Sequence, residues 1–250
     1  MHNSEDLYTD TDTDTNEQYD LSIATKQETD LCIERALLSV NLNSIKLKGH
    51  FCRKKRILDL VGAMGGMIFL GLLYPFIALG IKLSSSGPVM FIQDRTGKNG
   101  RVFKCYKFRT MHTGISKRES KNQPVVTEVG DRRIFAFGNF LRKSNLDELP
   151  QIINIIKGDM SLVGPRPLPI DECHHWRSTI PNFELRYAVK PGLTGWAQVT
   201  GYRGGTLDVK HMVFRLKRDF KYIENYSVTL DFKIIGKTLK QMIIRDTKAH

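Results

Sequence analysis

The stretch Leu60-Val-Gly-Ala-Met-Gly-Gly-Met-Ile-Phe-Leu-Gly-Leu-Leu-Tyr-Pro-Phe-Ile-Ala-Leu-Gly-Ile81 decides the topology of this chain. It holds 22 residues without a charge, and the basic run Arg53-Lys-Lys-Arg56 precedes it. As an α-helix, a segment of this length covers roughly 33 Å, which is enough to cross a bilayer. Gly62 and Gly66 form a GxxxG pair, a spacing typical of close packing between helices. A membrane-spanning helix is therefore the first interpretation.

Two features favour a helix that enters the membrane and returns on the same side. Pro75 lies inside the stretch, where it removes a backbone hydrogen bond and disfavours a straight helix by about 3 kcal/mol. Both flanks are cationic, with a basic run before the stretch and Lys82 after it. The positive-inside tendency keeps such flanks on the cytoplasmic side. We therefore expect a re-entrant membrane helix in residues 51–86, bent at Pro75.

Charge is unevenly distributed along the 250 residues. The chain carries 38 Lys and Arg against 26 Asp and Glu, a net charge of +12. Residues 1–50 hold 4 bases and 10 acids, a net of −6, whereas residues 51–250 hold 34 and 16, a net of +18. A segment this basic indicates an anionic partner, such as nucleic acid, lipid headgroups or phosphorylated substrates. The hydrophobic content of 41% excludes full-length disorder and a disulfide-stapled miniprotein.

The acidic residues 1–50 include the low-complexity run Thr9-Asp-Thr-Asp-Thr-Asp-Thr15. Such a run buries too little apolar surface to offset its ordering entropy. We expect this segment to be largely disordered, with a short helix over residues 29–41, and assign it no function. Its acidic, polar opening predicts no secretory signal. The four cysteines of the chain lack metal-ligand spacing, and we expect free thiols in a reducing compartment.

Residues 87–250 are expected to form one small α+β domain. Residues 89–92 and 101–111 are strand candidates, joined through the hairpin signal Asn99-Gly100. The polar residues 112–130 predict a mobile loop. Apolar residues at helical spacing predict helices over residues 147–157, 210–223 and 230–244. The last two are also rich in Lys and Arg, which suits amphipathic helices at a membrane interface. The alternative is ordinary core helices with solvated lysines.

Adjacent acids and nearby bases gather in Phe140-Leu-Arg-Lys-Ser-Asn-Leu-Asp-Glu-Leu-Pro-Gln151. Asp147 and Glu148 fall at a predicted helix N-terminus, where amide N–H groups and the helix dipole lower the pKa of a carboxylate. Arg142 and Lys143 precede them and can fold back over the site. Two acids beside two bases suit metal–phosphate chemistry, with magnesium as the natural cation. The alternative is a helix cap with surface salt bridges.

Two further segments offer basic groups. The prolines of Pro165-Arg-Pro167 stiffen the backbone around an arginine, and a guanidinium held that way can chelate phosphate oxygens. The alternative is a turn with a surface arginine. Lys107 and Arg109 stand on a predicted strand among aromatic residues, a pattern that nucleic-acid binders also show. Asp171-Glu-Cys-His-His175 contains metal-ligand residue types, but adjacent side chains do not share a helix face, so we expect no transition-metal site there.

Taken together, these segments resemble the monotopic phosphoglycosyl transferases, the bacterial sugar transferases that begin capsule, exopolysaccharide and O-antigen assembly. The resemblance runs from about Lys55 to the C-terminus, roughly four-fifths of the chain. The segments that carry it stand in the family's order: Lys55-Arg-Ile-Leu-Asp59, Gly87-Pro-Val-Met-Phe-Ile-Gln93, Lys107-Phe-Arg-Thr-Met111, Leu146-Asp-Glu-Leu-Pro-Gln151, Gly158-Asp-Met-Ser-Leu-Val-Gly-Pro-Arg-Pro167 and Pro191-Gly-Leu-Thr-Gly195.

The resemblance implies a re-entrant helix broken at a proline and a catalytic domain on the cytoplasmic face of the inner membrane. The family's common Ser-Pro break is Tyr74-Pro75 here, which departs from the pattern. The implied substrates are a UDP-sugar and a polyprenyl (undecaprenyl) phosphate, with membrane lipids as further partners. The implied reaction transfers a sugar-1-phosphate to the lipid phosphate through a covalent aspartyl-phosphosugar intermediate and releases UMP.

The resemblance also assigns roles to individual residues. Asp147 matches the family's nucleophile and Glu148 its partner, and both are expected near magnesium. Arg142 matches the family's phosphate-binding arginine. Arg166 matches the arginine of the family's Pro-Arg-Pro motif, which lies near the nucleotide. Lys107 and Arg109 match its basic strand.

Two other classes of protein remain open at this point. A membrane-tethered nucleic-acid binder would use the basic residues 51–250, but the acids Asp147 and Glu148 would repel phosphate without a metal, so we expect no nucleic-acid partner. A catalytically silent membrane scaffold could recruit other glycan enzymes.

Gly201-Tyr-Arg-Gly-Gly-Thr206 lies where many hexose-1-phosphate members carry a similar motif, which favours glucose or galactose and leaves N-acetylated sugars open. The oligomeric state is also open, a homodimer being one option.

Overall fold

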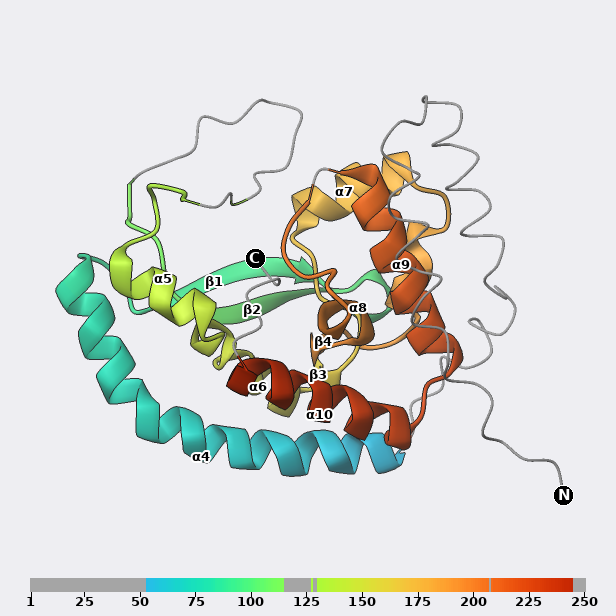
Figure 1. The fold of residues 1–250 in the computed structure, drawn as a ribbon, viewed down its shortest axis with the longest axis horizontal. Helices are drawn as coiled ribbons and strands as arrows, with labels where there is room; N and C mark the ends of the chain where they lie inside the picture. The colour runs from blue at the N-terminus through green and yellow to red at the C-terminus, as the bar shows by residue number, and fades with distance from the viewer. Residues whose placement is uncertain (1–52, 115–126, 128–129, 207, 245–250) are drawn as a thin grey trace, which may run out of the picture. The chain divides into compact units, whose positions relative to one another are not determined.

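The structure is a computed structural model, and it describes residues 53–114, 127, 130–206 and 208–244. All of them belong to one compact unit, Val40–His250. Helices and short strands are mixed along the chain (Figure 1), which confirms the mixed α+β class. With the labels of Figure 1, the elements are α4 (Arg53–Ser84), β1 (Met90–Thr96), β2 (Val102–Phe108), α5 (Ala136–Lys143), α6 (Gln151–Lys157), β3 (Ser161–Val163), α7 (Ile170–Thr179), β4 (Gly192–Thr194), α8 (Trp196–Val199), α9 (Val209–Glu224) and α10 (Val228–Ile244), with 3-10 segments at Lys98–Gly100, Leu146–Glu148 and Phe183–Ala188.

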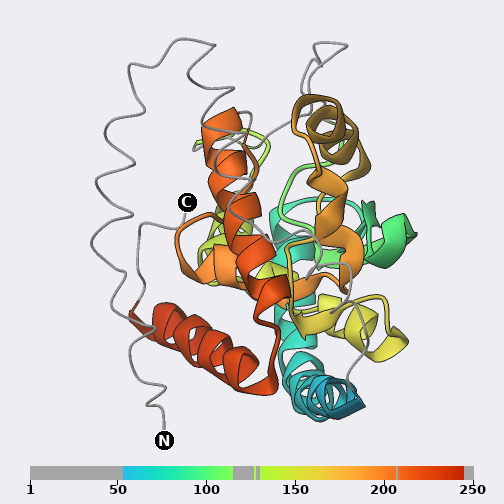
Figure 2. The same ribbon diagram turned by 90° about the vertical axis from the view of Figure 1, so that its right-hand side faces the viewer.

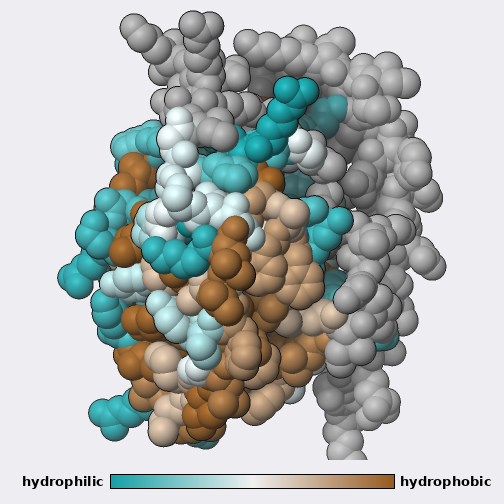
Figure 3. Space-filling view, turned by 90° about the vertical axis from the view of Figure 1, so that its left-hand side faces the viewer, coloured by the Kyte–Doolittle hydropathy of each residue, from teal (hydrophilic) through white to brown (hydrophobic). Residues whose placement is uncertain are grey.

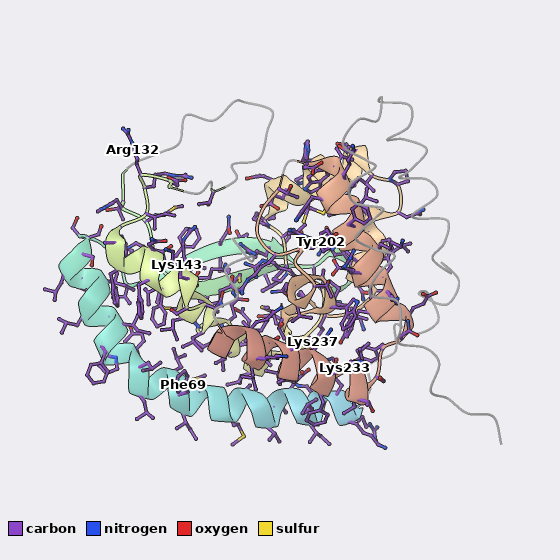
Figure 4. The ribbon with its side chains drawn as sticks, in the orientation of Figure 1. Phe69, Arg132, Lys143, Tyr202, Lys233 and Lys237 are labelled. Carbon is purple, nitrogen blue, oxygen red and sulfur yellow. The ribbon has the colours of Figure 1, made fainter. Side chains whose placement is uncertain are left out.

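α4 is one continuous helix of 32 residues that passes through Pro75. In Figure 1 it runs along the lower edge of the domain and then turns upward towards its C-terminal end. Figure 4 places Phe69 on the stretch before this turn. A proline inside a helix removes one backbone hydrogen bond and bends the helix. The structure therefore shows a bend in a continuous helix where the resemblance implied a break.

The N-terminal end of α4 is fixed to the domain by buried polar contacts. Lys55 Nζ donates to Asp231 Oδ2 at 2.6 Å, which joins α4 to α10. The Asp59 carboxylate accepts hydrogen bonds from Ser161 Oγ at 2.8 Å and from the Leu162 backbone N–H at 2.9 Å, which joins α4 to β3. Figure 2 shows α10 beside this end of α4. Each of these five polar groups has a hydrogen-bond partner, so none of them incurs an unpaired desolvation cost.

The C-terminal end of α4 is held by the same domain. Arg109, which follows β2, donates from Nη1 to Ser85 Oγ and from Nη2 to the Ser85 carbonyl, each at 2.8 Å. Between the two ends, the inner face of α4 packs with side chains of β2 and of the α5 region in one buried cluster: Leu70, Ile77, Ile81, Phe108, Phe135 and Leu141. Both ends of the apolar stretch are therefore attached to one domain.

Gly62 and Gly66 let α4 approach the domain closely. A Cβ atom at Gly62 would collide with the Leu162 side chain of β3, and one at Gly66 would collide with Ile152 of α6. The glycine pair thus provides the close packing that its spacing predicts. Only Gly66 faces another helix, because the side chain opposite Gly62 belongs to a strand.

The outer face of α4 is apolar and exposed. Its exposed large hydrophobic residues are Ile57, Val61, Met64, Ile68, Phe69, Leu72, Tyr74, Phe76, Leu79 and Leu83. Among the described residues, α4 is the one helix long and apolar enough to cross a membrane, with a mean hydropathy of 2.0 over its most apolar 18 residues, 17% of which are buried. Figure 3 shows hydrophobic residues gathered over the middle and lower parts of one face. An apolar surface of this kind marks contact with a membrane or a partner.

β1 and β2 form an antiparallel hairpin, with Met90 opposite Phe108. The turn contains Asn99 and Gly100, whose φ angles of 56° and 75° are both positive. Asn-Gly is the pair that tolerates two such residues in succession, so the predicted hairpin is confirmed. β3 and β4 form a second, parallel pair of three residues each.

The two basic amphipathic helices differ in what covers their apolar faces. The stripe of α9 is buried in the core, as the core-packing alternative predicted: Met212, Val213, Leu216, Phe220 and Ile223. α10 buries Ile234, but it exposes Phe232, Leu239 and Met242. Figure 4 shows Lys233 and Lys237 on the same helix. Only α10 therefore keeps the combination of exposed apolar and basic side chains expected at a membrane interface.

Several predictions fall wholly or partly outside the described residues. They are the disordered segment 1–50 with its short helix at 29–41, and most of the predicted loop 112–130. Cys105 and Cys173 are free and buried. This agrees with free thiols for the two cysteines that the structure describes.

Replacing Asp59 with alanine tests how α4 is held. The substitution leaves the Ser161 hydroxyl and the Leu162 N–H without their buried acceptor, so we expect the free energy of unfolding to fall by about 1–3 kcal/mol. Denaturant unfolding of the detergent-solubilised protein measures the loss. As a control, Asp94→Ala removes an exposed carboxylate that lies 3.4 Å from Lys104, and should change the free energy by less than about 1 kcal/mol. Equal losses in both variants would contradict this account of the attachment.

Candidate active site

Asp147 and Glu148 lie in the short 3-10 segment Leu146–Glu148, between α5 and α6. Asn145, just before it, has a φ of 59°, a left-handed conformation that asparagine tolerates better than most residues. α6 begins only at Gln151, four residues later than predicted. Pro150 accounts for the difference, because it has no N–H to donate and so caps the helix instead of extending it. The two acids are therefore presented by a tight turn.

Glu148 is the centre of a buried cluster of charges. Its Oε1 accepts from Lys107 Nζ at 2.7 Å and from Arg166 Nη2 at 2.5 Å, and its Oε2 accepts from Arg166 Nη1 at 3.0 Å. Arg203 Nη2 donates to the same Oε2 at 3.3 Å. The cations come from β2, from the segment after β3, and from the segment between α8 and α9. One carboxylate thus joins three parts of the chain that are distant in sequence.

These contacts shift the protonation equilibria of the cluster. Burial alone would raise the pKa of Glu148, but Arg166 and Lys107 outweigh burial and hold it well below its usual range. Burial alone would lower the pKa of Arg166, but Glu148 raises it above its usual value. Burial lowers the pKa of Lys107, and Glu148 opposes this shift. Glu148 is therefore firmly ionised.

Asp147 shows the opposite shift. Its burial, together with the negative charge of Glu148, raises the pKa of Asp147, while Lys107 and Arg142 oppose the rise. Within the described part of the chain, its carboxylate forms no hydrogen bond and no ion pair. The sequence predicted lowered pKa values for both acids, and the structure gives this only for Glu148. The difference arises because the cations are aimed at Glu148, which leaves Asp147 unengaged.

Arg142 lies near Asp147, as the sequence predicted. Its Nε donates to Thr110 Oγ1 at 2.8 Å, and this bond orients the guanidinium. The positive charge of Arg142 lowers the pKa of Asp147. Lys143, in contrast, is exposed at the C-terminal end of α5 (Figure 4). Of the two predicted neighbouring bases, the structure brings one into the site.

Arg109 is a predicted site residue that the structure places elsewhere. Its guanidinium donates to the carbonyl oxygens of Pro88, at 2.5 Å, and Met111, at 3.2 Å, in addition to its two bonds to Ser85. Residues two apart on a strand share a face, which would put Lys107 and Arg109 together. β2 ends at Phe108, however, so Arg109 lies beyond the strand and points to the end of α4.

Arg166 is held where the prolines of its segment predicted a restricted arginine. The Gly164 N–H donates to the Thr194 carbonyl and the Gly192 N–H to the Pro165 carbonyl, each at 2.9 Å, so the pairing of β3 with β4 fixes the start of the segment. A guanidinium fixed in this way can donate two parallel bonds, which Arg166 does to Glu148.

Arg203 is a site residue that the sequence analysis did not predict. It lies in the glycine-rich segment 201–206, where Gly201 and Gly204 have φ angles of 94° and 91°. A single arginine enclosed by glycines in such a turn is the signal that could have drawn attention to it. The contact with Glu148 is a tertiary one over 55 residues and is not visible in the sequence.

The donor set limits where a magnesium ion fits. No group of three or more metal-ligand side chains occurs in the residues that the structure describes. The cluster Asp171–His175 belongs to α7. Magnesium commonly uses one or two carboxylates together with substrate phosphates and water. Each oxygen of Glu148 already accepts two hydrogen bonds, so Asp147 is the acid of the pair whose carboxylate fits a magnesium ion shared with a phosphorylated ligand.

Fold and site together define a class of protein: a small α+β domain, attached along a membrane-length apolar helix, with two adjacent buried acids among cations suited to phosphate groups. The bacterial sugar transferase family matches residues 50–245, about four-fifths of the chain. The chain therefore belongs to the bacterial sugar transferase family, and the resemblance described above is confirmed.

Curated relatives agree with this assignment. The UDP-glucose:undecaprenyl-phosphate glucose-1-phosphate transferase of Escherichia coli K12 is 43% identical over 187 residues, 74% of this chain and 39% of the relative. The protein of the same name from Caulobacter vibrioides is 41% identical over 77% of this chain and 71% of the relative. The UDP-N-acetylgalactosamine-undecaprenyl-phosphate N-acetylgalactosaminephosphotransferase of Aeromonas hydrophila is 38% identical over 76% of this chain and 43% of the relative. The chain thus spans less than half the length of two of these three relatives.

Glu148→Gln tests whether the negative charge of this one carboxylate stabilises the three cations of the cluster. The substitution leaves three cations in a buried position without their shared counter-charge, so we expect the free energy of unfolding to fall by about 3 kcal/mol. The control Glu184→Gln removes the acid of an exposed pair with Arg177, and should cost less than about 1 kcal/mol. Denaturant unfolding of both variants gives the two values. A loss at position 148 no larger than at position 184 would show that the cluster does not depend on Glu148.

Proposed function

We propose that this chain is a phosphoglycosyl transferase. It transfers a sugar-1-phosphate from a UDP-sugar to a polyprenyl phosphate, releases UMP, and so begins the assembly of a bacterial surface polysaccharide. Membership of the bacterial sugar transferase family and the names of the relatives support this function. The observation that carries the mechanism is the contrast between two neighbours: Glu148 is engaged by three cations, and Asp147 is buried beside it with an unengaged carboxylate.

In the first step, a carboxylate oxygen of Asp147 attacks the phosphorus of the sugar-linked β-phosphate. The bond from that phosphorus to the oxygen bridging the α-phosphate breaks, and UMP leaves with this oxygen. The sugar phosphate stays on Asp147 as an acyl phosphate. The raised pKa makes the carboxylate more basic than that of an exposed aspartate, which favours nucleophilic attack.

In the second step, an oxygen of the polyprenyl phosphate attacks the phosphorus of the acyl phosphate. The bond to Asp147 breaks, its carboxylate is regenerated, and the product is a polyprenyl-diphosphate-linked sugar. Dividing the transfer into two displacements lets one small site serve a water-soluble and a lipid substrate in turn.

The cations stabilise the charge of the transferring phosphoryl group. Glu148 holds Arg166 and Arg203 next to Asp147, and Thr110 orients Arg142 towards the same region. Charged donors that are already in place cost no reorganisation during the reaction. Magnesium, held by Asp147 with the substrate phosphates, would supply further screening between the carboxylate and the diphosphate.

We infer that α4 is re-entrant and that the domain lies on the cytoplasmic face of the inner membrane. Both ends of the apolar stretch are attached to the same domain, through Asp59 and Ser85. The outer face of α4 is apolar along its length, and α10 adds exposed apolar residues beside lysines. A domain lying on the membrane in this way would place its site at headgroup height, where the lipid phosphate is found.

UDP-glucose is the donor to test first. Two of the relatives described above are named for glucose-1-phosphate transfer, at 43% and 41% identity. The relative named for N-acetylgalactosamine, at 38% identity, makes UDP-N-acetylgalactosamine the second donor to test.

Asp147→Asn removes the proposed nucleophile. We expect the rate of UMP release from UDP-sugar, with polyprenyl phosphate and magnesium present, to fall at least about 10³-fold, roughly 4 kcal/mol in the barrier. Asp94→Asn, at an exposed position on β1, serves as the matched control and should keep near-normal activity. Near-normal turnover by purified Asp147→Asn protein would refute the assignment. The same assay tests the function, since a nucleic-acid binder or a silent scaffold releases no UMP.

The pH dependence of the reaction should report the ionisation of Asp147. Only the carboxylate attacks, so kcat/KM falls on the acid side as Asp147 binds a proton. Because its pKa is raised, this fall lies above the ordinary aspartate value of 3.8. Arg142 lowers the pKa of Asp147, so Arg142→Gln should move the fall to higher pH, whereas Lys143→Gln, at an exposed position, should leave it in place. Identical acid limbs in Arg142→Gln and wild type would contradict the assignment of this limb to Asp147.

A further inference from the structure

Three buried arginines contact the segments that carry the site arginines Arg166 and Arg203. Arg95 on β1, Arg186 in the 3-10 segment Phe183–Ala188 and Arg215 on α9 are 8%, 2% and 0% exposed. Each of them donates a hydrogen bond to a backbone carbonyl of one of these segments. The proposed mechanism so far gives none of the three a role.

Arg186 and Arg95 hold the segment that carries Arg166. Arg186 Nη2 donates to the Arg166 carbonyl at 2.8 Å, and Arg95 Nη1 donates to the Pro167 carbonyl at 2.5 Å. Two consecutive carbonyls are thus fixed from the protein interior. This restricts rotation of the backbone from which the Arg166 side chain reaches Glu148.

Arg215 and its helix hold the segment that carries Arg203. Arg215 Nη2 donates to the Gly204 carbonyl at 2.5 Å. On the other side of Arg203, the guanidinium of Arg218 lies 4.1 Å from the centre of the Tyr202 ring. Figure 4 shows Tyr202 near α9. α9 therefore contacts the residues on both sides of Arg203.

Asp219 links the two sets of contacts. Its Oδ2 accepts from Arg186 Nη2 at 2.9 Å. Arg215 precedes Asp219 by four residues on α9, which puts the two side chains on neighbouring turns of one helix face. Burial raises the pKa of Asp219, and the charges of Arg186 and Arg215 both oppose the rise. One buried acid on α9 is thus the shared neighbour of two arginines that hold two different segments.

Stability alone does not account for these arginines. A buried charge loses its hydration, and an apolar side chain of similar volume would avoid this cost. In addition, Nε and Nη1 of both Arg186 and Arg215 lack a hydrogen-bond partner among the described residues. Burial lowers the pKa of Arg215 to about 10, with Arg186 adding to the shift. What these side chains supply in return is a fixed position for two backbone carbonyls.

We propose that Arg186, Arg215 and Asp219 are positioning residues, which fix the two segments that bring Arg166 and Arg203 onto Glu148. The proposal rests on the proposed phosphoglycosyl transfer. The three residues act through the site arginines and not on the reacting atoms.

Kinetics of Arg186→Lys test the proposal. Lysine keeps the charge, but its side chain is one atom shorter, so its Nζ does not reach the position from which Arg186 Nη2 donates to both the Arg166 carbonyl and Asp219. We expect kcat/KM for the UDP-sugar to fall about tenfold, because small displacements of catalytic cations are costly. The control Asp231→Asn changes an equally buried acid that pairs with Lys55, and should keep kcat/KM within about twofold while also lowering the melting temperature.

Combining variants separates positioning from general loosening of the fold. In an Arg166→Gln background, Arg186→Lys should cost less than about a further twofold, because the side chain that it positions is gone. In an Arg203→Gln background, it should still cost about tenfold. Equal multiplicative losses in both backgrounds, or a loss in Asp231→Asn as large as in Arg186→Lys, would overturn the proposal.

Hydrogen exchange provides a readout that does not depend on activity. In Asp219→Asn, backbone amides in residues 164–168 and 201–206 should exchange faster than in wild type, while the β1–β2 hairpin is unchanged. Unchanged exchange in both segments would overturn the positioning role. Absence of UMP release by the wild type would contradict only the proposed function, and the exchange measurement would then decide the positioning.

Discussion

The charge of Glu148 is the constraint on which the site depends. Lys107, Arg166 and Arg203 approach one another from three distant segments, and in a buried position they would repel one another without a shared counter-ion. Glu148 supplies that charge permanently, since its cations hold its pKa low. Because the cations are directed to Glu148, Asp147 keeps its own carboxylate unengaged beside a region of high positive charge. An acid with an unengaged carboxylate and a group of cations are thereby held together before any ligand binds.

The same turn is coupled to the long apolar helix α4. α6 starts shortly after Glu148, and its Ile152 packs so closely against α4 that a Cβ atom at Gly66 would lie 2.6 Å from Ile152 Cδ1. Asp59 attaches α4 to β3, which leads directly into the segment of Arg166. The apolar helix therefore supports both sides of the site through its inner face, while its outer face is apolar and exposed.

Features set by local chemistry were predictable from the sequence. Asn99-Gly100 specified its turn, and the paired prolines indicated a restricted Arg166. Features set by tertiary contacts were not. Arg203 reaches Glu148 only because a glycine-rich segment is folded against α9, and Arg109 leaves the site because its strand ends one residue earlier. The amphipathic pattern of α9 and α10 gave no indication of which apolar face the protein itself would cover, since burial against lipid and burial in a core require the same periodicity.

The central claim is that Asp147 becomes esterified to a sugar phosphate. Mass spectrometry of the peptide that contains Asp147, after rapid quenching of the protein with UDP-sugar and no lipid acceptor, measures this directly. The account predicts that the peptide gains the mass of one sugar phosphate, and that the gain is lost once polyprenyl phosphate is added. Accumulation of lipid-linked product under conditions in which this peptide never gains mass would contradict it.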